Sequence, residues 1–136
     1  MSGVVMSADI TAWQTQLRKG VAECVVLSLL EVEERYGLDI LRRATSSIGV
    51  LSAGTLYPLL TRLEREGKIV GRWVVDTKTR NSRKYYRLSN DGAALLVEMK
   101  AVWADFASFV TAVVAVGSFV EDQAYEFDHH ANARSV

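Results

Sequence analysis

Three features of the sequence predict a mainly helical α+β fold. Leucines recur at helical spacing between Ser52 and Glu66, two segments rich in β-branched and aromatic residues follow, and a long apolar repeat occupies residues 93–120. The first and third features indicate helices, and the second indicates a β-hairpin. A chain of 136 residues has the size of one structural domain.

The chain is expected to begin with a long helix. Apolar residues from Ile10 onward follow a three-four spacing, which predicts a helix from Ala8 to about Glu33. Its second half is apolar on almost all sides, which indicates burial. Gly20 is expected either to break this helix or to let another helix approach closely.

A shorter helix and a tight connection come next. Tyr36-Gly37 ends the first helical pattern, and residues 38–44 predict a second helix. Residues 46–51 contain Gly49 and predict a turn into the third helix. Two short helices joined in this way form a helix-turn-helix.

The third helix, predicted over residues 52–66, has a leucine stripe at the i, i+3, i+4, i+7 positions. The stripe consists of Leu56, Leu59, Leu60 and Leu63. A stripe of this kind packs against a core. The opposite face is small, polar and basic, which suits the major groove of DNA, although an ordinary solvated helix can show the same pattern.

The ends of the third helix also have clear signals. Ser52 is a suitable cap, and Gly67 suits the left-handed residue after the helix. Pro58 lies inside the pattern, so we expect a helix that is bent or that starts late.

A hairpin is predicted directly after the third helix. Ile69–Val75 and Tyr85–Leu88 have the composition of strands, and the polar segment 76–84 between them carries four cations. A hairpin in this position is a wing, and its basic loop suits phosphate. Taken alone, the loop is equally compatible with a solvated hairpin tip.

Charge is distributed unevenly along a chain whose formal net charge is zero. Residues 17–88 contain fourteen basic and eight acidic residues, whereas the remainder contains two basic and eight acidic residues. The predicted helix-turn-helix and wing therefore have a net charge of +6, which suits a nucleic acid.

The last helix carries two apolar rows. One row forms a heptad seam from Leu96 to Gly117, and a second row repeats every seven residues on an adjacent face. Ser89 is its expected cap. One small domain offers too little core for both rows, so we infer a homodimer; the alternative is that both rows pack within the monomer.

These patterns predict the organisation of the whole chain. Residues 1–92 form the expected DNA-binding region with its N-terminal helix, 93–120 form the dimerisation helix, and 121–136 are expected to be a disordered tail. His129-His130 lacks partners at metal-ligand spacing, and we expect neither a metal nor another cofactor.

Several short motifs together resemble the PadR family of bacterial transcriptional regulators. They are Gly54–Leu60, Arg62–Gly67, Trp73, Arg83–Ser89 and Gly92, in the order and spacing of that family. The resemblance covers about residues 17–114 and is closest to the shorter subfamily with one long C-terminal helix. One departure is Arg80-Asn81-Ser82, where the family often has a Gly-Arg-Pro sequence.

The resemblance implies a winged helix-turn-helix dimer on a pseudo-palindromic operator. Such a protein usually represses a gene until a small aromatic or lipophilic effector binds. Trp103 matches a tryptophan that lines an apolar chamber between the subunits of some members. A tryptophan on a heptad seam can equally be ordinary core.

The predicted functional residues fall into three groups. Those expected to contact DNA are Tyr36, Ser52, Thr55, Tyr57, Thr61, Arg62, Arg65, Lys78, Arg80, Arg83 and Lys84. Those expected to contact an effector are Trp13, Leu17, Met99, Trp103 and Phe106. The predicted dimer interface consists of Leu96, Met99, Trp103, Phe106, Val110 and Val113.

Two of these residues have more specific predicted roles. Arg62 is expected to reach a guanine in the major groove. Tyr36 is expected either to place its hydroxyl on the DNA backbone or to pack against the third helix.

Other classes of protein fit the sequence less well. Cys24 is the only cysteine, which favours a reducing cytoplasm. It lies in the most apolar segment, which favours an inert thiol. We find no secretory signal, no apolar run long enough to span a bilayer and no set of residues typical of an enzyme. The remaining alternative is a winged-helix protein-protein adaptor that does not bind DNA.

Overall fold

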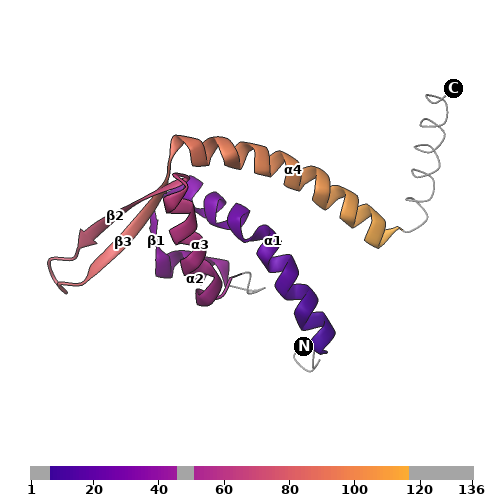
Figure 1. The fold of residues 1–136 in the computed structure, drawn as a ribbon, viewed down its shortest axis with the longest axis horizontal. Helices are drawn as coiled ribbons and strands as arrows, with labels where there is room; N and C mark the ends of the chain where they lie inside the picture. The colour runs from indigo at the N-terminus through magenta and orange to yellow at the C-terminus, as the bar shows by residue number, and fades with distance from the viewer. Residues whose placement is uncertain (1–6, 46–50, 117–136) are drawn as a thin grey trace. The chain divides into compact units, whose positions relative to one another are not determined.

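The structure is a computed structural model, and it describes residues 7–45 and 51–116. In chain order the elements are α1 (Ala8–Val32), β1 (Arg35–Tyr36), α2 (Gly37–Ala44), α3 (Ala53–Arg65), β2 (Ile69–Val75), β3 (Ser82–Leu88) and α4 (Asn90–Ala115) (Figure 1). The predicted mainly helical α+β fold is confirmed. Most of the predicted turn before α3 (46–51) and all of the predicted tail (121–136) lie outside the described residues.

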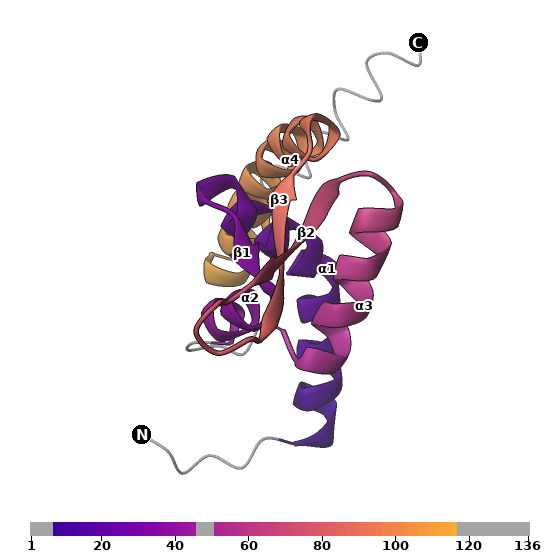
Figure 2. The same cartoon turned by 90° about the vertical axis from the view of Figure 1, so that its left-hand side faces the viewer.

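The three strands form one antiparallel sheet in the order β1-β3-β2. β1 has only two residues and was not predicted, because no period can be recognised in so short a strand. β3 begins at Ser82, three residues before the predicted start, which leaves Asp76–Asn81 as the loop. Figure 1 shows the β2–β3 hairpin extending away from α2 and α3, and in Figure 2 it points toward the viewer; we call this hairpin with its loop the wing.

The chain divides into two compact units with the boundary between Val97 and Glu98, inside α4. The helix-turn-helix, the sheet and the first turns of α4 belong to the first unit. Within the described ranges, none of the helices combines the length and apolarity needed to cross a bilayer.

α1 follows its prediction closely. It ends at Val32, and the Ser7 hydroxyl caps its start by accepting a hydrogen bond of 3.2 Å from the backbone N–H of Ile10. The helix continues through Gly20 without a break, and no described residue lies within 4 Å of a Cβ atom built there. The predicted break at Gly20 is therefore wrong, and the close approach of another helix stays a prediction.

The core of the first unit lies between α1, α2, α3 and the sheet. Its fully buried side chains include three members of the leucine stripe and apolar residues of the neighbouring elements: Val26, Leu27, Ile40, Leu51, Leu56, Leu60, Leu63, Ile69 and Leu96. The fourth member, Leu59, is half-buried at the edge of the stripe.

α3 has the predicted caps at both ends. The Ser52 hydroxyl accepts a hydrogen bond of 3.3 Å from the Thr55 N–H, and Gly67 has a φ of +77°. The helix begins at Ala53, so it does not start late, and the alternative of a bent helix stays a prediction. Pro58 lies in the second turn, where it removes only one backbone hydrogen bond near the N-terminal end of the helix.

The start of α4 is fixed to the turn that follows α3. Ser89 donates hydrogen bonds from its hydroxyl to the Gly67 carbonyl (2.6 Å) and from its N–H to the Lys68 carbonyl (3.1 Å). The same hydroxyl accepts from the Gly92 N–H at 3.0 Å, which confirms Ser89 as the cap. A Cβ atom on Gly92 would lie 1.9 Å from the Lys68 carbonyl oxygen, so only glycine allows this approach.

We predict that Gly92→Ala destabilises the fold by roughly 1 to 3 kcal/mol, because backbone atoms cannot move aside as a flexible side chain can. Urea unfolding of the wild type and the variant measures the difference. The matched control is Gly54→Ala, since a Cβ atom there would meet only the Ser52 hydroxyl oxygen at 3.9 Å. Equal unfolding midpoints for Gly92→Ala and the wild type would contradict the prediction.

Candidate nucleic-acid interface

The recognition surface begins with the outer face of α3. Burial of the leucine stripe directs the polar face of the helix toward solvent, where Tyr57, Thr61 and Arg65 are exposed and Thr55 is half-buried. The Thr61 hydroxyl donates a hydrogen bond of 3.0 Å to the Tyr57 carbonyl. The Ser52 hydroxyl, besides capping the helix, lies 3.2 Å from the Thr55 hydroxyl.

Tyr57 links this face to α2. A Cβ atom on Gly37 would lie 2.8 Å from Cε1 of Tyr57, so the ring packs against the first residue of α2 while about half of the side chain stays exposed. This packing restricts the ring orientation before any ligand is present. The predicted contact of Tyr57 with DNA stays a prediction.

Arg62 is engaged within the protein. Its guanidinium forms ion pairs with Glu23 of α1 (3.1 Å) and with Glu66 (3.0 Å). The hydrogen bond with Glu23 raises the pKa of Arg62 above its usual value. These carboxylates compete with guanine for the guanidinium, and the predicted contact with guanine stays a prediction.

The wing loop is an ordered turn that exposes two cations. The Asp76 carboxylate accepts a hydrogen bond of 2.8 Å from the Lys78 N–H, and this bond lowers the pKa of Asp76. The Arg80 N–H donates to the Asp76 carbonyl at 2.7 Å, and Arg80 has a φ of +59°, which is uncommon for a residue other than glycine. Lys78 and Arg80 are both exposed.

The structure corrects the position of two other predicted DNA contacts. Arg83 and Lys84 were predicted in the loop, but they lie within β3, because strand pairing with β2 extends as far as Val75 and Ser82. Arg83 stacks on the ring of Tyr36, with its Cζ atom 4.6 Å from the ring centroid. Lys84 forms an ion pair with Glu64 of α3 at 2.7 Å.

Tyr36 also has partners that the sequence did not predict. Its ring makes an edge-to-face contact with Tyr85, with centroids 5.4 Å apart, in addition to the stacked Arg83. These rings lie on the sheet, so β3 holds Tyr36, and its two expected roles, at the DNA backbone or against α3, stay predictions.

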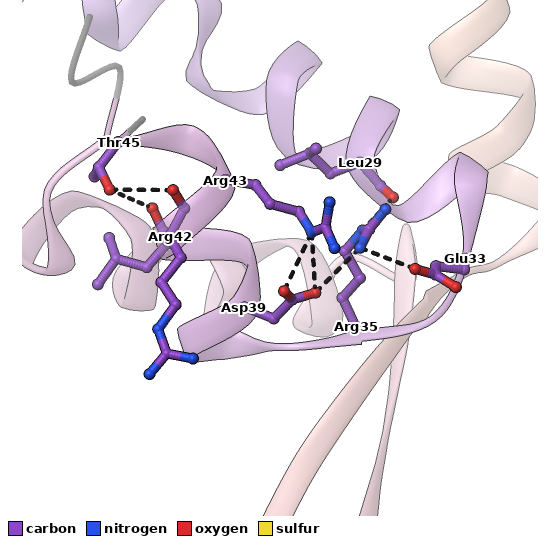
Figure 3. Close-up of polar contacts among 8 residues, drawn as sticks. Leu29, Glu33, Arg35, Asp39, Arg42, Arg43 and Thr45 are labelled. Carbon is purple, nitrogen blue, oxygen red and sulfur yellow. Dashed lines mark hydrogen bonds and ion pairs between the residues drawn. The ribbon is translucent and has the colours of Figure 1, made fainter. Parts of the chain in front are cut away.

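An ion cluster around the buried Arg35 joins the end of α1 to α2 (Figure 3). Arg35 is only 4% exposed and donates hydrogen bonds to the Leu29 carbonyl (2.9 Å), to Glu33 (3.1 Å) and to Asp39 (3.1 Å). Arg43 donates a further bond of 3.1 Å to Asp39. The sequence did not predict a role for Arg35, because its partners lie in α1, just after α1 and in α2.

The predicted interface residues of α4 differ in their burial. Leu96 is 1% exposed, so its assignment to a dimer interface is wrong: the first unit buries it in its own core. In the second unit, Trp103 is 47% exposed, Phe106 and Val110 are exposed, and Met99 and Val113 are half-buried. On α1, Trp13 and Leu17 are also exposed. The predicted effector contacts of these residues stay predictions.

A helix-turn-helix followed directly by a β-hairpin defines this chain as a winged helix-turn-helix protein. Residues 26–98 match the model of the PadR-like family of transcriptional regulators. This range is more than half of the chain and runs from the second half of α1 to the first turns of α4. The chain therefore belongs to the PadR-like family.

Solved structures support the same assignment. A PadR family transcriptional regulator from Eggerthella lenta is 30% identical, with a TM-score of 0.67 over 79% of this chain and 93% of that chain. A PadR-like regulator from Bacillus cereus is 30% identical, with a TM-score of 0.66 over 73% and 96% of the respective chains. A PadR-like transcription factor from Bacteroides fragilis is 34% identical, with a TM-score of 0.61 over 75% and 98%.

The ion cluster around Arg35 predicts how stability depends on pH. Burial alone would raise the pKa of Asp39, but hydrogen bonds from Arg35 and Arg43 outweigh it, and the pKa of Asp39 lies below its usual value. A carboxylate of this kind stabilises the fold above its unfolded pKa of about 3.9, and the contribution is lost as the pH falls through the lower folded value. We therefore expect the urea midpoint to fall more steeply below about pH 4 in the wild type than in Asp39→Asn.

The matched control for this prediction is Asp105→Asn, which removes an exposed carboxylate from α4. Its acid profile should follow that of the wild type. Parallel profiles for the wild type and Asp39→Asn would show that the cluster does not act through the charge of Asp39.

Proposed function

We propose that this PadR-family protein is a sequence-specific DNA-binding regulator that binds a pseudo-palindromic operator as a homodimer. The observation that carries the proposal is the polar face of α3, exposed beside a wing whose loop presents Lys78 and Arg80. A helix of this shape fits the major groove, and the cations of the wing suit phosphates or the minor groove.

The two parts of this surface have different roles. Thr55, Tyr57 and Thr61 contact the duplex from α3, with Thr55 and Tyr57 mainly at phosphates, and Arg65 at the end of the helix steers the approach. Lys78 and Arg80 bind the backbone without regard to sequence. Specificity therefore comes from α3 and affinity largely from the wing.

The proposed dimer is supported by the apolar side chains of α4. Trp103, Phe106, Phe109 and Val110 are all exposed on this helix, and a soluble monomer rarely exposes so many large apolar side chains together. A second copy of the chain covers them. A small aromatic or lipophilic effector binds at that interface next to Trp103 and relieves repression.

Two alternatives compete with this proposal. A protein-protein adaptor would use the wing without DNA and would not need an exposed basic loop. An enzyme is disfavoured because members of the family are transcription regulators. The proposed activity also places the protein in the cytoplasm, where a bacterial operator lies.

We predict that the wild type binds random duplex DNA at low salt and that Lys78→Ala/Arg80→Ala weakens binding to every sequence. Each lost phosphate contact reduces the slope of log affinity against log salt by about one, so the double variant should lose about two. Fluorescence anisotropy over a salt series measures both quantities. An adaptor would show no binding even for the wild type.

The matched control for the wing is Arg18→Ala/Lys19→Ala, which removes two positive charges from α1. This variant should keep the wild-type salt slope. An unchanged salt slope in Lys78→Ala/Arg80→Ala as well would show that the wing does not contact the DNA backbone.

We also predict that planar aromatic compounds quench the fluorescence of the dimer and that Trp103→Phe abolishes most of this quenching. Trp73→Phe is the control, because Trp73 lies on the wing. Sedimentation of the same samples should give a dimer. A monomer at micromolar concentration would contradict the proposed interface.

A further inference from the structure

We propose that Glu64 and Lys84 are positioning residues of the DNA interface: their ion pair fixes the wing on the recognition helix, and Lys84 does not bind phosphate. This inference rests on the proposed function and deepens it. It also revises the sequence-based expectation that Lys84 contacts DNA directly.

The pair joins two elements that must act on the same duplex. Glu64 lies in the last turn of α3, and Lys84 lies in β3, twenty residues further along the chain. The Lys84 ammonium donates a hydrogen bond of 2.7 Å to the Glu64 carboxylate, and the two side chains are only 28% and 33% exposed. This contact therefore links the helix to the hairpin through side chains.

Gly71 of β2 leaves room for the Glu64–Lys84 ion pair. A Cβ atom on Gly71 would lie 2.5 Å from the Glu64 carboxylate and 2.5 Å from Cε of Lys84. The strand register places Gly71 opposite Tyr86 and Trp73 opposite Lys84, so these four residues share one face of the sheet. The absence of a side chain at position 71 lets the pair lie across both strands of the wing.

Aromatic rings complete the surroundings of the ammonium group. The Lys84 nitrogen lies 5.5 Å from the ring centroid of Tyr86 and 5.9 Å from that of Trp73, which is within the range of cation–π attraction. The hydrogen bond with Glu64 raises the pKa of Lys84, so the group stays charged. Its charge is matched inside the protein, in contrast to the exposed Lys78 and Arg80.

The effect of the pair is geometric. Exposed and half-exposed ion pairs contribute little to global stability, so loss of this pair leaves the domain folded. The wing is a hairpin that extends from the rest of the unit (Figure 1), and a change in its angle to α3 moves the loop cations away from their phosphates. The pair therefore preorganises the interface, which reduces the ordering needed when DNA binds.

The decisive experiment is the effect of Glu64→Gln on affinity for a random duplex at low salt. Removal of a negative charge near DNA should strengthen binding if simple electrostatics governs. Positioning predicts the opposite, a loss of roughly fivefold or more. The matched control is Glu98→Gln, which removes an exposed carboxylate from α4 and should bind as well as the wild type.

Charge exchange separates positioning from direct contact. Lys84→Gln should weaken binding without a change in the salt slope, and Glu64→Lys/Lys84→Glu should recover much of the affinity. If Lys84 contacts phosphate, the exchanged variant binds more weakly than either single change and the salt slope falls by about one. Unfolding midpoints close to that of the wild type confirm that the variants are folded.

A readout that does not require DNA completes the test. In a Trp13→Phe/Trp103→Phe background, Trp73 is the only remaining tryptophan, and it lies beside Lys84. Glu64→Gln and Gly71→Ala should both shift its emission and increase its quenching by acrylamide. An unchanged Trp73 signal, or wild-type DNA affinity in Glu64→Gln, would overturn the inference. If the Trp73 signal changes in these variants but the wild type binds no duplex, the result would instead refute the proposed function alone.

Discussion

Burial of the leucine stripe on α3 is the constraint on which the rest of this structure depends. Leu56, Leu60 and Leu63 are fully covered by α1, α2 and the sheet, so the helix can rotate very little about its axis. The polar face is exposed as a direct result. A substitution within the stripe would therefore affect recognition and stability together. A substitution on the polar face would affect recognition and leave stability largely unchanged.

Ion pairs then fix the flanks of a helix whose back is already buried. Glu23 holds Arg62 from α1, Glu64 reaches Lys84 on the wing, and Arg72 of β2 bonds to Glu34 before β1. The hydrogen bond from Arg72 lowers the pKa of Glu34. Each bridge joins elements that lie far apart in the sequence, so the charged residues of the first unit serve the geometry of the fold as well as any ligand.

The sequence predicted local features well and long-range partners poorly. The bounds of α1, α2 and α3 to within one residue, the caps at Ser52 and Ser89 and the left-handed Gly67 follow from short patterns and were confirmed. The last helix ends at Ala115, before the predicted end at residue 120. β1 was missed because pairing with β3, and not its own composition, makes those two residues a strand. The partners of Arg35, Arg62 and Lys84 could not be predicted, since spacing shows which residues share a helix face but not which carboxylate lies opposite.

The contact at Gly92 has a mechanical consequence. The first turn of α4 rests on the Lys68 carbonyl, and Ser89 is hydrogen-bonded to Gly67 and Lys68, the second and third residues after α3. These parts form one joint without a slack linker. A force on the first turn of α4 is therefore transmitted directly to the residues that follow the recognition helix.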